Sequence, residues 1–88
     1  MGSFRIELKG SVEKDLRRLP PDTLARISHK IATLAANPLS SPVRKLEGTD
    51  TLYRIRVGDY RIIYSVDLKQ RLVVVQTVRH RKDAYRRA

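Results

Sequence analysis

Arginine side chains alternate with apolar ones on both sides of a Gly-Asp pair in the second half of the sequence. If Gly58 and Asp59 are the two loop residues of a β-hairpin, Arg56 lies directly opposite Arg61, and Arg54 lies two positions away on the same face. Like charges that face each other across two strands are destabilising, so folding alone does not explain this arrangement. Guanidinium groups bind phosphate through a planar fork of donors. The pattern therefore predicts a site for a phosphate-bearing partner.

A second basic group near the end of the sequence includes two side chains that can move protons. It consists of Arg79, His80, Arg81, Lys82 and Tyr85. Imidazole titrates in the range useful for acid–base catalysis, whereas a tyrosine needs nearby cations to act as a base. The length of the loop before the last strand is not fixed by the pattern. The sequence therefore leaves open whether Arg79 and Arg81, or instead His80, share the face of Arg61.

These residue types suit one reaction, the cleavage of RNA by its own 2′-hydroxyl group. The nucleophile belongs to the substrate, so the protein has to position it, move protons and stabilise the charge on phosphorus. Arginines can supply the electrostatic part, and tyrosine or histidine can transfer protons. No metal or other cofactor is required. The sequence shows no Ser/His/Asp set, paired carboxylates, His/Cys cluster or Gly-rich phosphate loop that would indicate other chemistry.

Length and charge limit the class of protein. The 88 residues allow a single domain over residues 1–88, and the net charge of +10 is large for that size. Residues 1–43 carry 7 Lys/Arg and 4 Asp/Glu, whereas residues 44–88 carry 12 and 5. The second half is expected to meet a polyanion, first of all nucleic acid and next an acidic protein. Membrane-surface binding is less favoured, because the basic residues follow strand patterns.

Cysteine is absent, which excludes disulfides and thiolate chemistry and fits a cytoplasmic location. No apolar run reaches membrane-spanning length, and no signal peptide is visible. We therefore expect no membrane partner.

The elements that must position the basic residues follow from hydrophobic periodicity. Alternation predicts strands over residues 3–9, 53–57 and 60–67. An apolar run predicts a central strand, covered on both faces, over residues 72–78. Two helices are predicted by apolar stripes at helical spacing: Val12, Leu16 and Leu19, then Leu24, Ile27, Ile31 and Leu34, backed by Ala35.

Local signals predict where these helices begin and end. Ser11 is a good N-cap for the first helix. Pro20 and Pro21 separate the two helices, with Pro21 in the first turn of the second, and Asn37-Pro38 ends it. The apolar stripes need a partner, and the sheet supplies it. The expected fold is α+β, an antiparallel-rich twisted sheet of about four strands with an N-terminal helical hairpin packed on it.

Two other features are predicted to have minor roles. Residues 38–52 form a Pro- and Ser-rich connection with a short extended piece around residues 43–46, where Arg44 and Lys45 could reach phosphate. His29 falls on the polar side of the second helix and is predicted to be a surface histidine.

The chain resembles the RelE/ParE superfamily of bacterial and archaeal toxins. The motifs that carry the resemblance are G-D-Y-R-I-I-Y, from Gly58 to Tyr64, and the V-R-H-R-K-D-A-Y-R ending, and the similarity covers roughly Phe4 to Arg87. The resemblance implies a RelE-like domain that acts as a ribosome-dependent mRNA endonuclease and inhibits translation. It also implies a cognate acidic antitoxin, RelB-like, that holds the toxin inactive.

The resemblance extends to the roles of single residues. The predicted catalytic residues are Arg61, Arg81, Tyr85 and His80, and the predicted substrate-binding residues are Arg54, Arg56, Arg79 and Lys82. Arg61 matches a phosphate-stabilising arginine, Arg81 a general acid or charge stabiliser, and Tyr85 a general base. The spacing from Arg81 to Tyr85 is shorter than in the best-known RelE. His80 has no counterpart there, although histidines in this region serve as acid or base in some relatives.

Two alternative functions remain open from the sequence. A ParE-like toxin of the same fold would act on DNA gyrase without cutting RNA, although such relatives generally lack the full basic and aromatic set. A non-catalytic nucleic-acid-binding module would use its charge alone.

Overall fold

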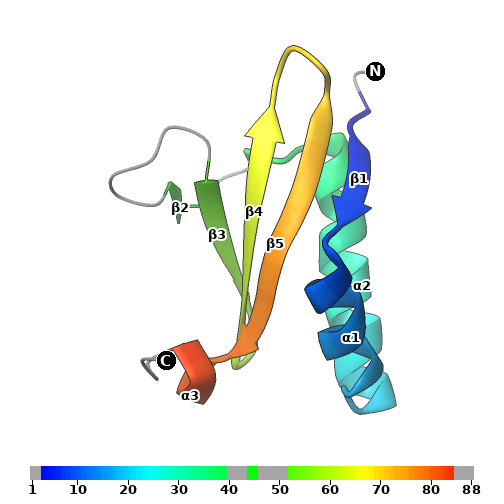
Figure 1. Ribbon diagram of the computed structural model, residues 1–88, viewed down its shortest axis with the longest axis vertical. Coiled ribbons are helices and arrows are strands. Elements are labelled where there is room, and N and C mark those ends of the chain that lie inside the picture. The colour runs from blue at the N-terminus through cyan, green and yellow to red at the C-terminus, as the bar shows by residue number, and fades with distance from the viewer. Residues whose placement is uncertain (1–2, 40–43, 46–51, 85–88) are drawn as a thin grey trace.

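The two alternating runs around Gly58 form an antiparallel hairpin of β3 (Leu52–Val57) and β4 (Tyr60–Asp67) (Figure 1). This computed structural model describes residues 3–39, 44–45 and 52–84. The hairpin register is the predicted one, with Val57 opposite Tyr60 and Arg56 opposite Arg61. Gly58 has a φ of 58°, which a glycine adopts without strain and which a two-residue hairpin loop requires.

The sheet has the strand order β1-β5-β4-β3-β2. The long strand β5 (Leu72–His80) runs antiparallel to β4, and β1 (Arg5–Leu8) runs parallel to β5. At the other side, the two-residue strand β2 (Arg44–Lys45) pairs antiparallel with β3. Four longer strands in a mainly antiparallel sheet confirm the predicted α+β class. The rest of the predicted extended piece at residues 43–46 lies outside the described residues.

Helices α1 (Gly10–Arg17) and α2 (Pro21–Ala36) lie on the same side of the sheet (Figure 1). Their predicted apolar stripes form the core together with alternate residues of three strands. The fully buried residues include Val12, Ile27 and Leu34 from the helices and Ile62, Tyr64, Val73 and Val75 from the strands. Burying this apolar surface supplies the main free energy of folding.

The helix ends agree with the predictions at the prolines and differ at Ser11. Pro20 is the N-cap of α2, Pro21 stands in its first turn, and the helix ends at Ala36 with Asn37 as C-cap. The prediction that Ser11 caps α1 is wrong, because the helix begins one residue earlier at Gly10. Lys9 occupies the cap position without a side-chain hydrogen bond. Its backbone carbonyl instead accepts the N–H groups of Val12 and Glu13.

Strand β5 is covered by helices on one face, whereas coverage of both faces was predicted. Val73, Val75 and Val78 are buried against α1 and α2, but Leu72 and Val74 on the other face are half-buried. Val75 and Val78 share the covered face although they are three positions apart, because a β-bulge shifts the pairing with β4 between Ile63 and Tyr64. Helices α1 and α2 thus leave the second face of the sheet uncovered.

Tyr64 ties the chain after α2 to the sheet. Its hydroxyl donates a hydrogen bond of 2.6 Å to the carbonyl of Pro38, and its ring stacks on Tyr53 with centroids 6.1 Å apart. Burial, with a smaller contribution from Tyr53, raises the pKa of Tyr64 well above its usual value. The side chain is fully buried and therefore stays a neutral donor.

Within the described part of the chain, no helix is both long and apolar enough to cross a membrane.

Candidate functional site

Three arginines stand directly opposite one another across the three adjacent strands β3, β4 and β5. Arg56 pairs with Arg61, and Arg61 pairs with Arg79, so these residues form a row across the open face of the sheet. Arg54 lies two positions from Arg56 on the same strand face and pairs with Arg44 of β2. We call Arg54, Arg56, Arg61 and Arg79 the arginine face. The structure therefore settles the open question about the last strand, because Arg79 shares the face of Arg61.

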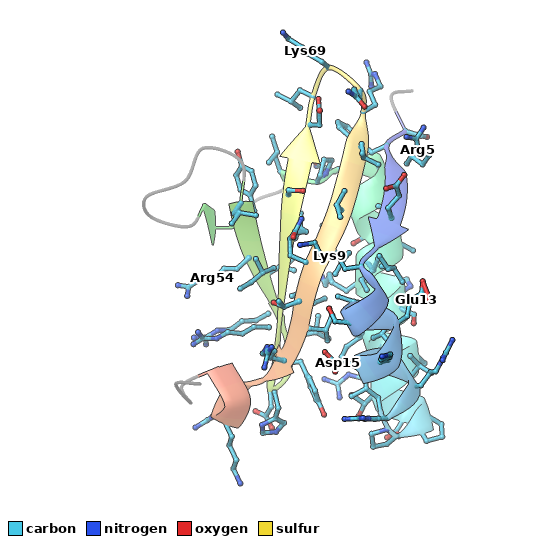
Figure 2. All side chains as sticks on the ribbon, viewed as in Figure 1. Arg5, Lys9, Glu13, Asp15, Arg54 and Lys69 are labelled. Atoms are coloured by element: carbon cyan, nitrogen blue, oxygen red, sulfur yellow. The ribbon has the colours of Figure 1, made fainter. Side chains whose placement is uncertain are left out.

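Three members of the arginine face have no acidic ion-pair partner among the described residues. No described carboxylate lies within ion-pair distance of Arg54, Arg56 or Arg79. Arg54 points away from the side that carries α1 and α2, where Glu13 and Asp15 lie (Figure 2). Directly opposed like charges are destabilising in a sheet, so an anion bound at the row would stabilise it.

Arg81 joins the arginine face at the hairpin turn. The short helix α3 (Arg81–Ala84) follows β5, and the N–H of Arg81 donates to the carbonyl of Asp59 at 2.6 Å. The side chain of Arg81 lines a hollow of about 220 Å³ together with Arg56, Gly58, Asp59, Tyr60 and Arg61. Three guanidinium groups around one hollow can donate several charge-assisted hydrogen bonds to a single phosphate.

His80 lies on the opposite face of the sheet from Arg61. It pairs with Tyr60, and their rings meet edge to face with centroids 5.1 Å apart. His80 also lines a separate hollow against α1, with Asp15, Arg18 and Leu19. This position does not bring the imidazole to the arginine row and does not favour the direct proton transfer suggested from the sequence.

The two remaining residues predicted for the catalytic or substrate-binding site, Lys82 and Tyr85, lie in α3 and after it. Lys82 is exposed, one residue beyond Arg81. Tyr85, the predicted general base, lies outside the described residues. His29 is exposed on α2, as predicted for a surface histidine.

Sequence reasoning missed Asp59 and Tyr60 as parts of the site. Both line the hollow beside Arg81, and Asp59 supplies the carbonyl that receives the Arg81 N–H group. Their position at the β3–β4 turn could have indicated this. If β5 pairs with β4 along its whole length, β5 ends beside that turn and brings Arg81 next to it. Arg26 of α2 was also missed. Its guanidinium reaches Gly58 so closely that a Cβ atom there would come within 2.6 Å of Nη2.

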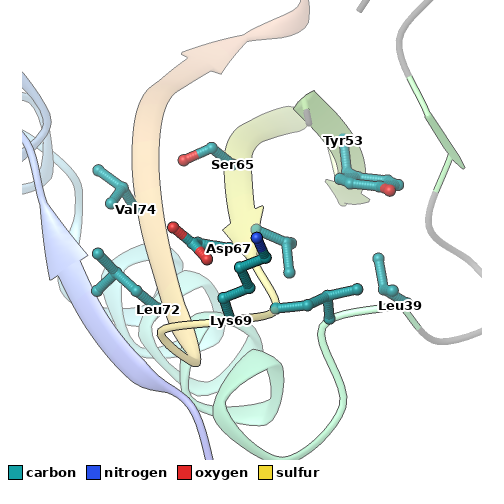
Figure 3. A pocket seen from close by; sticks show the side chains of 9 residues that line it. Leu39, Tyr53, Ser65, Asp67, Lys69, Leu72 and Val74 are labelled. Carbon is teal, nitrogen blue, oxygen red and sulfur yellow. The ribbon is translucent and has the colours of Figure 1, made fainter. Parts of the chain in front are cut away.

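A third and larger hollow, of about 620 Å³, lies at the other end of β4. Its lining is mixed, with Tyr53, Leu72 and Val74 beside Ser65, Asp67 and Lys69 (Figure 3). Leu39 and Leu68, which also line it, are 44% and 64% exposed. This hollow and the one beside Arg81 lie at opposite ends of β4, and Arg56, Arg61 and Arg79 lie at the end that carries the hairpin turn.

Comparison with known proteins identifies the family. A family described as the ParE toxin of type II toxin–antitoxin systems, parDE, matches residues 6–85. The RelE1 protein of Methanocaldococcus jannaschii is 34% identical over 86 residues, which cover 94% of this chain and 96% of that protein. The chain belongs to the RelE/ParE superfamily of type II toxins. Toxin RelG of Mycobacterium tuberculosis is also 34% identical to this RelE/ParE toxin, over 96% of this chain and 98% of the relative.

Solved structures show the same fold. The archaeal RelE–RelB complex from Pyrococcus horikoshii contains a chain with a TM-score of 0.80 and 34% identity, covering 90% of this RelE/ParE toxin and 96% of that chain. The RelBE2 complex of Mycobacterium tuberculosis gives a TM-score of 0.79 at 26% identity, covering 89% and 91%. The predicted RelE-like domain is therefore confirmed.

Proposed function

We propose that this toxin is an endoribonuclease that cleaves mRNA on the ribosome and so inhibits translation. The observation that carries the proposal is the row of Arg56, Arg61 and Arg79 beside Arg81, on a sheet face that the helices leave open. Such a row opposes folding and is compensated when a phosphate occupies it. The relatives named RelE support a nuclease rather than a passive binding module.

The proposed reaction uses the RNA's own 2′-oxygen. A base removes the 2′-hydroxyl proton and the 2′-oxygen attacks the adjacent phosphorus. The P–O5′ bond breaks as O5′ accepts a proton from solvent water. The products are a 2′,3′-cyclic phosphate and a 5′-hydroxyl end. In this scheme Arg61 and Arg81 stabilise the charge on the phosphoryl oxygens. Tyr85 is the proposed base, activated by the surrounding cations.

The remaining basic residues are proposed to hold the message. Arg54, Arg56 and Arg79 are in register on one face, and Lys82 follows on α3, so together they can contact successive phosphates. The scheme gives every step to protein, RNA or solvent groups, so we propose no metal ion or other cofactor.

Dependence on the ribosome follows from how little the protein offers for reading bases. The chain has four tyrosines and one phenylalanine, and Tyr64 is buried in the core. Aromatic stacking platforms of the kind that hold single-stranded RNA are therefore scarce. We expect the ribosome to hold the message in a reactive shape. Purified toxin should cleave ribosome-bound mRNA well and the same free RNA poorly, and equal rates on both would refute the ribosome dependence.

We also propose an acidic antitoxin as the natural partner. Similar chains are found in complexes named RelE–RelB, and the +10 charge of this toxin favours an acidic segment. Such a partner would cover the arginine face or displace the segment that begins at Arg81. Isolation of the native complex tests this, and a neutral partner bound only to α1 and α2 would contradict it.

A ParE-like activity is the second candidate, because the matching family is described as a ParE toxin. One translation reaction supplemented with gyrase and plasmid DNA separates the two. Cleaved mRNA with intact plasmid supports the nuclease, whereas gyrase-dependent DNA breaks with intact mRNA support the alternative. If neither is cleaved, the chain acts as a binding module.

A further inference from the structure

His80 has the geometry of an N-cap for α3. Helix α3 begins at Arg81, and the Nδ1 atom of His80 accepts a hydrogen bond of 3.1 Å from the backbone N–H of Lys82, the second residue of the helix. A side-chain acceptor in the cap position normally contacts the N–H of the second or third helical residue. The hydrogen bond requires the neutral ring with its proton on Nε2, because an imidazolium has no acceptor.

The cap has its own supports. The ring of Tyr60 packs edge to face against the imidazole, and both residues belong to the same directly opposed pair of β4 and β5. Asp15 of α1 borders the hollow in which His80 lies, together with Arg18 and Leu19, which follow that helix. The charged groups that face the imidazole are therefore Asp15 and Arg18, with Arg79, Arg81 and Lys82 within two residues of it in the chain. The imidazole thus packs on Tyr60 and borders the hollow on the side of the sheet that carries α1.

Arg81 lies between His80 and Lys82, the two residues that the cap hydrogen bond joins. Its N–H group is fixed to the Asp59 carbonyl, and the next N–H group is fixed to His80, so two consecutive backbone donors are held by two different elements. Its side chain lines the hollow that contains Arg56 and Arg61. A guanidinium must lie within hydrogen-bond distance of the developing charge to be effective, so the orientation of this turn matters.

We propose that His80 is a positioning residue, which caps α3 from the far side of the sheet and thereby directs Arg81 into the arginine site. This inference rests on the proposed nuclease function for its consequence in catalysis, but the cap itself can be measured without any activity. It differs from a role of His80 in proton transfer, because the ring needs only an acceptor at the Nδ1 position.

Three substitutions separate the two roles. In His80→Asn the side-chain oxygen takes the position of Nδ1, and asparagine is among the best N-caps. In His80→Gln the polar atoms lie one bond farther out, near Nε2, and His80→Ala removes the cap. His29→Ala, an exposed histidine on α2, is the matched control. Circular dichroism confirms that each variant is folded.

Backbone ¹⁵N relaxation of the free toxin is the measurement that is independent of activity. We expect order parameters of Arg81 and Lys82 near 0.85 in the wild type, His80→Asn and the control. In His80→Ala and His80→Gln they should fall toward 0.6. Unchanged order in His80→Ala would overturn the cap.

Single-turnover cleavage of ribosome-bound mRNA at saturating toxin then tests the consequence. His80→Ala and His80→Gln should cleave roughly tenfold more slowly, the change in occupancy expected for loss of a typical N-cap, while His80→Asn cleaves within about twofold of wild type. If His80→Asn is ordered but as slow as His80→Ala, the ring transfers protons and the proposal is wrong. If the wild type does not cleave, the proposed function fails while the relaxation data still decide whether the cap exists.

Discussion

Arg61 is the central residue of the row, because β4 lies between β3 and β5 and Arg61 is therefore opposed on both sides, by Arg56 and by Arg79. A donor in this central position can hydrogen-bond to the phosphoryl oxygens of a group bound anywhere along the row, where negative charge develops in the reaction. In the described pairing, Arg56 and Arg79 are each opposed by Arg61 alone. The residues of the row are thus not equivalent, and the largest catalytic effect is expected at the centre.

Arg61→Ala should lower the single-turnover rate by about 10²–10³, because it removes a donor aimed at charge in the transition state. Arg81→Ala should behave similarly, and Tyr85→Phe should lose roughly 10²–10⁴ with little change in binding if its hydroxyl transfers a proton. Lys69→Ala, in the loop at the other end of β4, is the control and should retain the rate. Wild-type rates for Arg61→Ala and Arg81→Ala at saturating toxin would mean that the cluster is only an electrostatic patch.

The same arginines should weaken the fold. Arg79 is exposed and directly opposes Arg61 across β4 and β5. Replacing it with threonine, a good strand former, should raise the free energy of unfolding by roughly 0.2–1 kcal/mol, as measured by urea denaturation at low salt. Arg79→Lys keeps the charge and should show no such gain. A less stable Arg79→Thr would show that the row contributes to folding, against the view that its purpose is binding.

At the scale of elements, the hairpin of β3 and β4 was predictable because the Gly58-Asp59 loop fixes the register on both sides. The position of β5 was not predictable in the same way. Counting back from the β4–β5 loop aligns Asp67 with Leu72, but β5 carries one extra residue at Gln76, whose side chain donates to the Ser65 hydroxyl. This bulge decides that Arg79, rather than His80, faces the same side as Arg61. Nothing in the apolar pattern around Gln76 indicates a bulge.

Gly58→Ala tests how strongly the turn is constrained. At a φ of 58°, alanine costs about 1–2 kcal/mol, and its Cβ would also meet the guanidinium of Arg26. Urea denaturation of Gly58→Ala and of the double variant with Arg26→Ala separates the two causes. The Arg26 side chain is exposed and can move, so the loss should persist in the double variant. Gly10→Ala, where a Cβ meets nothing within 4 Å, is the neutral control.

Tyr64→Phe tests the tie between the sheet and the end of α2. It deletes the 2.6 Å hydrogen bond and leaves the Pro38 carbonyl without this donor, which should cost about 1–3 kcal/mol of folding stability. Burial raises the Tyr64 pKa, so above about pH 10 the unfolded chain releases the proton more easily than the folded one. Wild-type stability therefore falls with rising pH more steeply than that of Tyr64→Phe. Parallel pH profiles of the two proteins would contradict this.

At the scale of the whole molecule, the two halves of the chain divide structure and charge between them. In the described parts of the chain, residues 1–43 supply both long helices and residues 44–88 supply four of the five strands. Residues 44–88 also carry most of the net charge. This division was visible in the composition, and so was the fold class. Which of the C-terminal basic residues share the face of Arg61 was not visible in the composition. It depends on the bulge in β5 and on the hydrogen bond between Arg81 and the hairpin turn.

The division predicts which charges meet the ribosome. If the arginine face binds RNA phosphates, Arg54→Ala should weaken ribosome binding and lower the slope of log K against log salt by about 0.7–1, because one fewer counterion is released. Arg17→Ala removes an equal charge from the end of α1, on the covered side of the sheet, and should leave the slope unchanged. Both substitutions are made in the slow-cleaving Arg61→Ala background, and ribosome binding is titrated between about 50 and 200 mM salt, which gives both slopes with little cleavage during the measurement. If Arg17→Ala lowers the slope as much as Arg54→Ala does, the ribosome senses the net charge of +10 and the arginine face has no privileged role in docking.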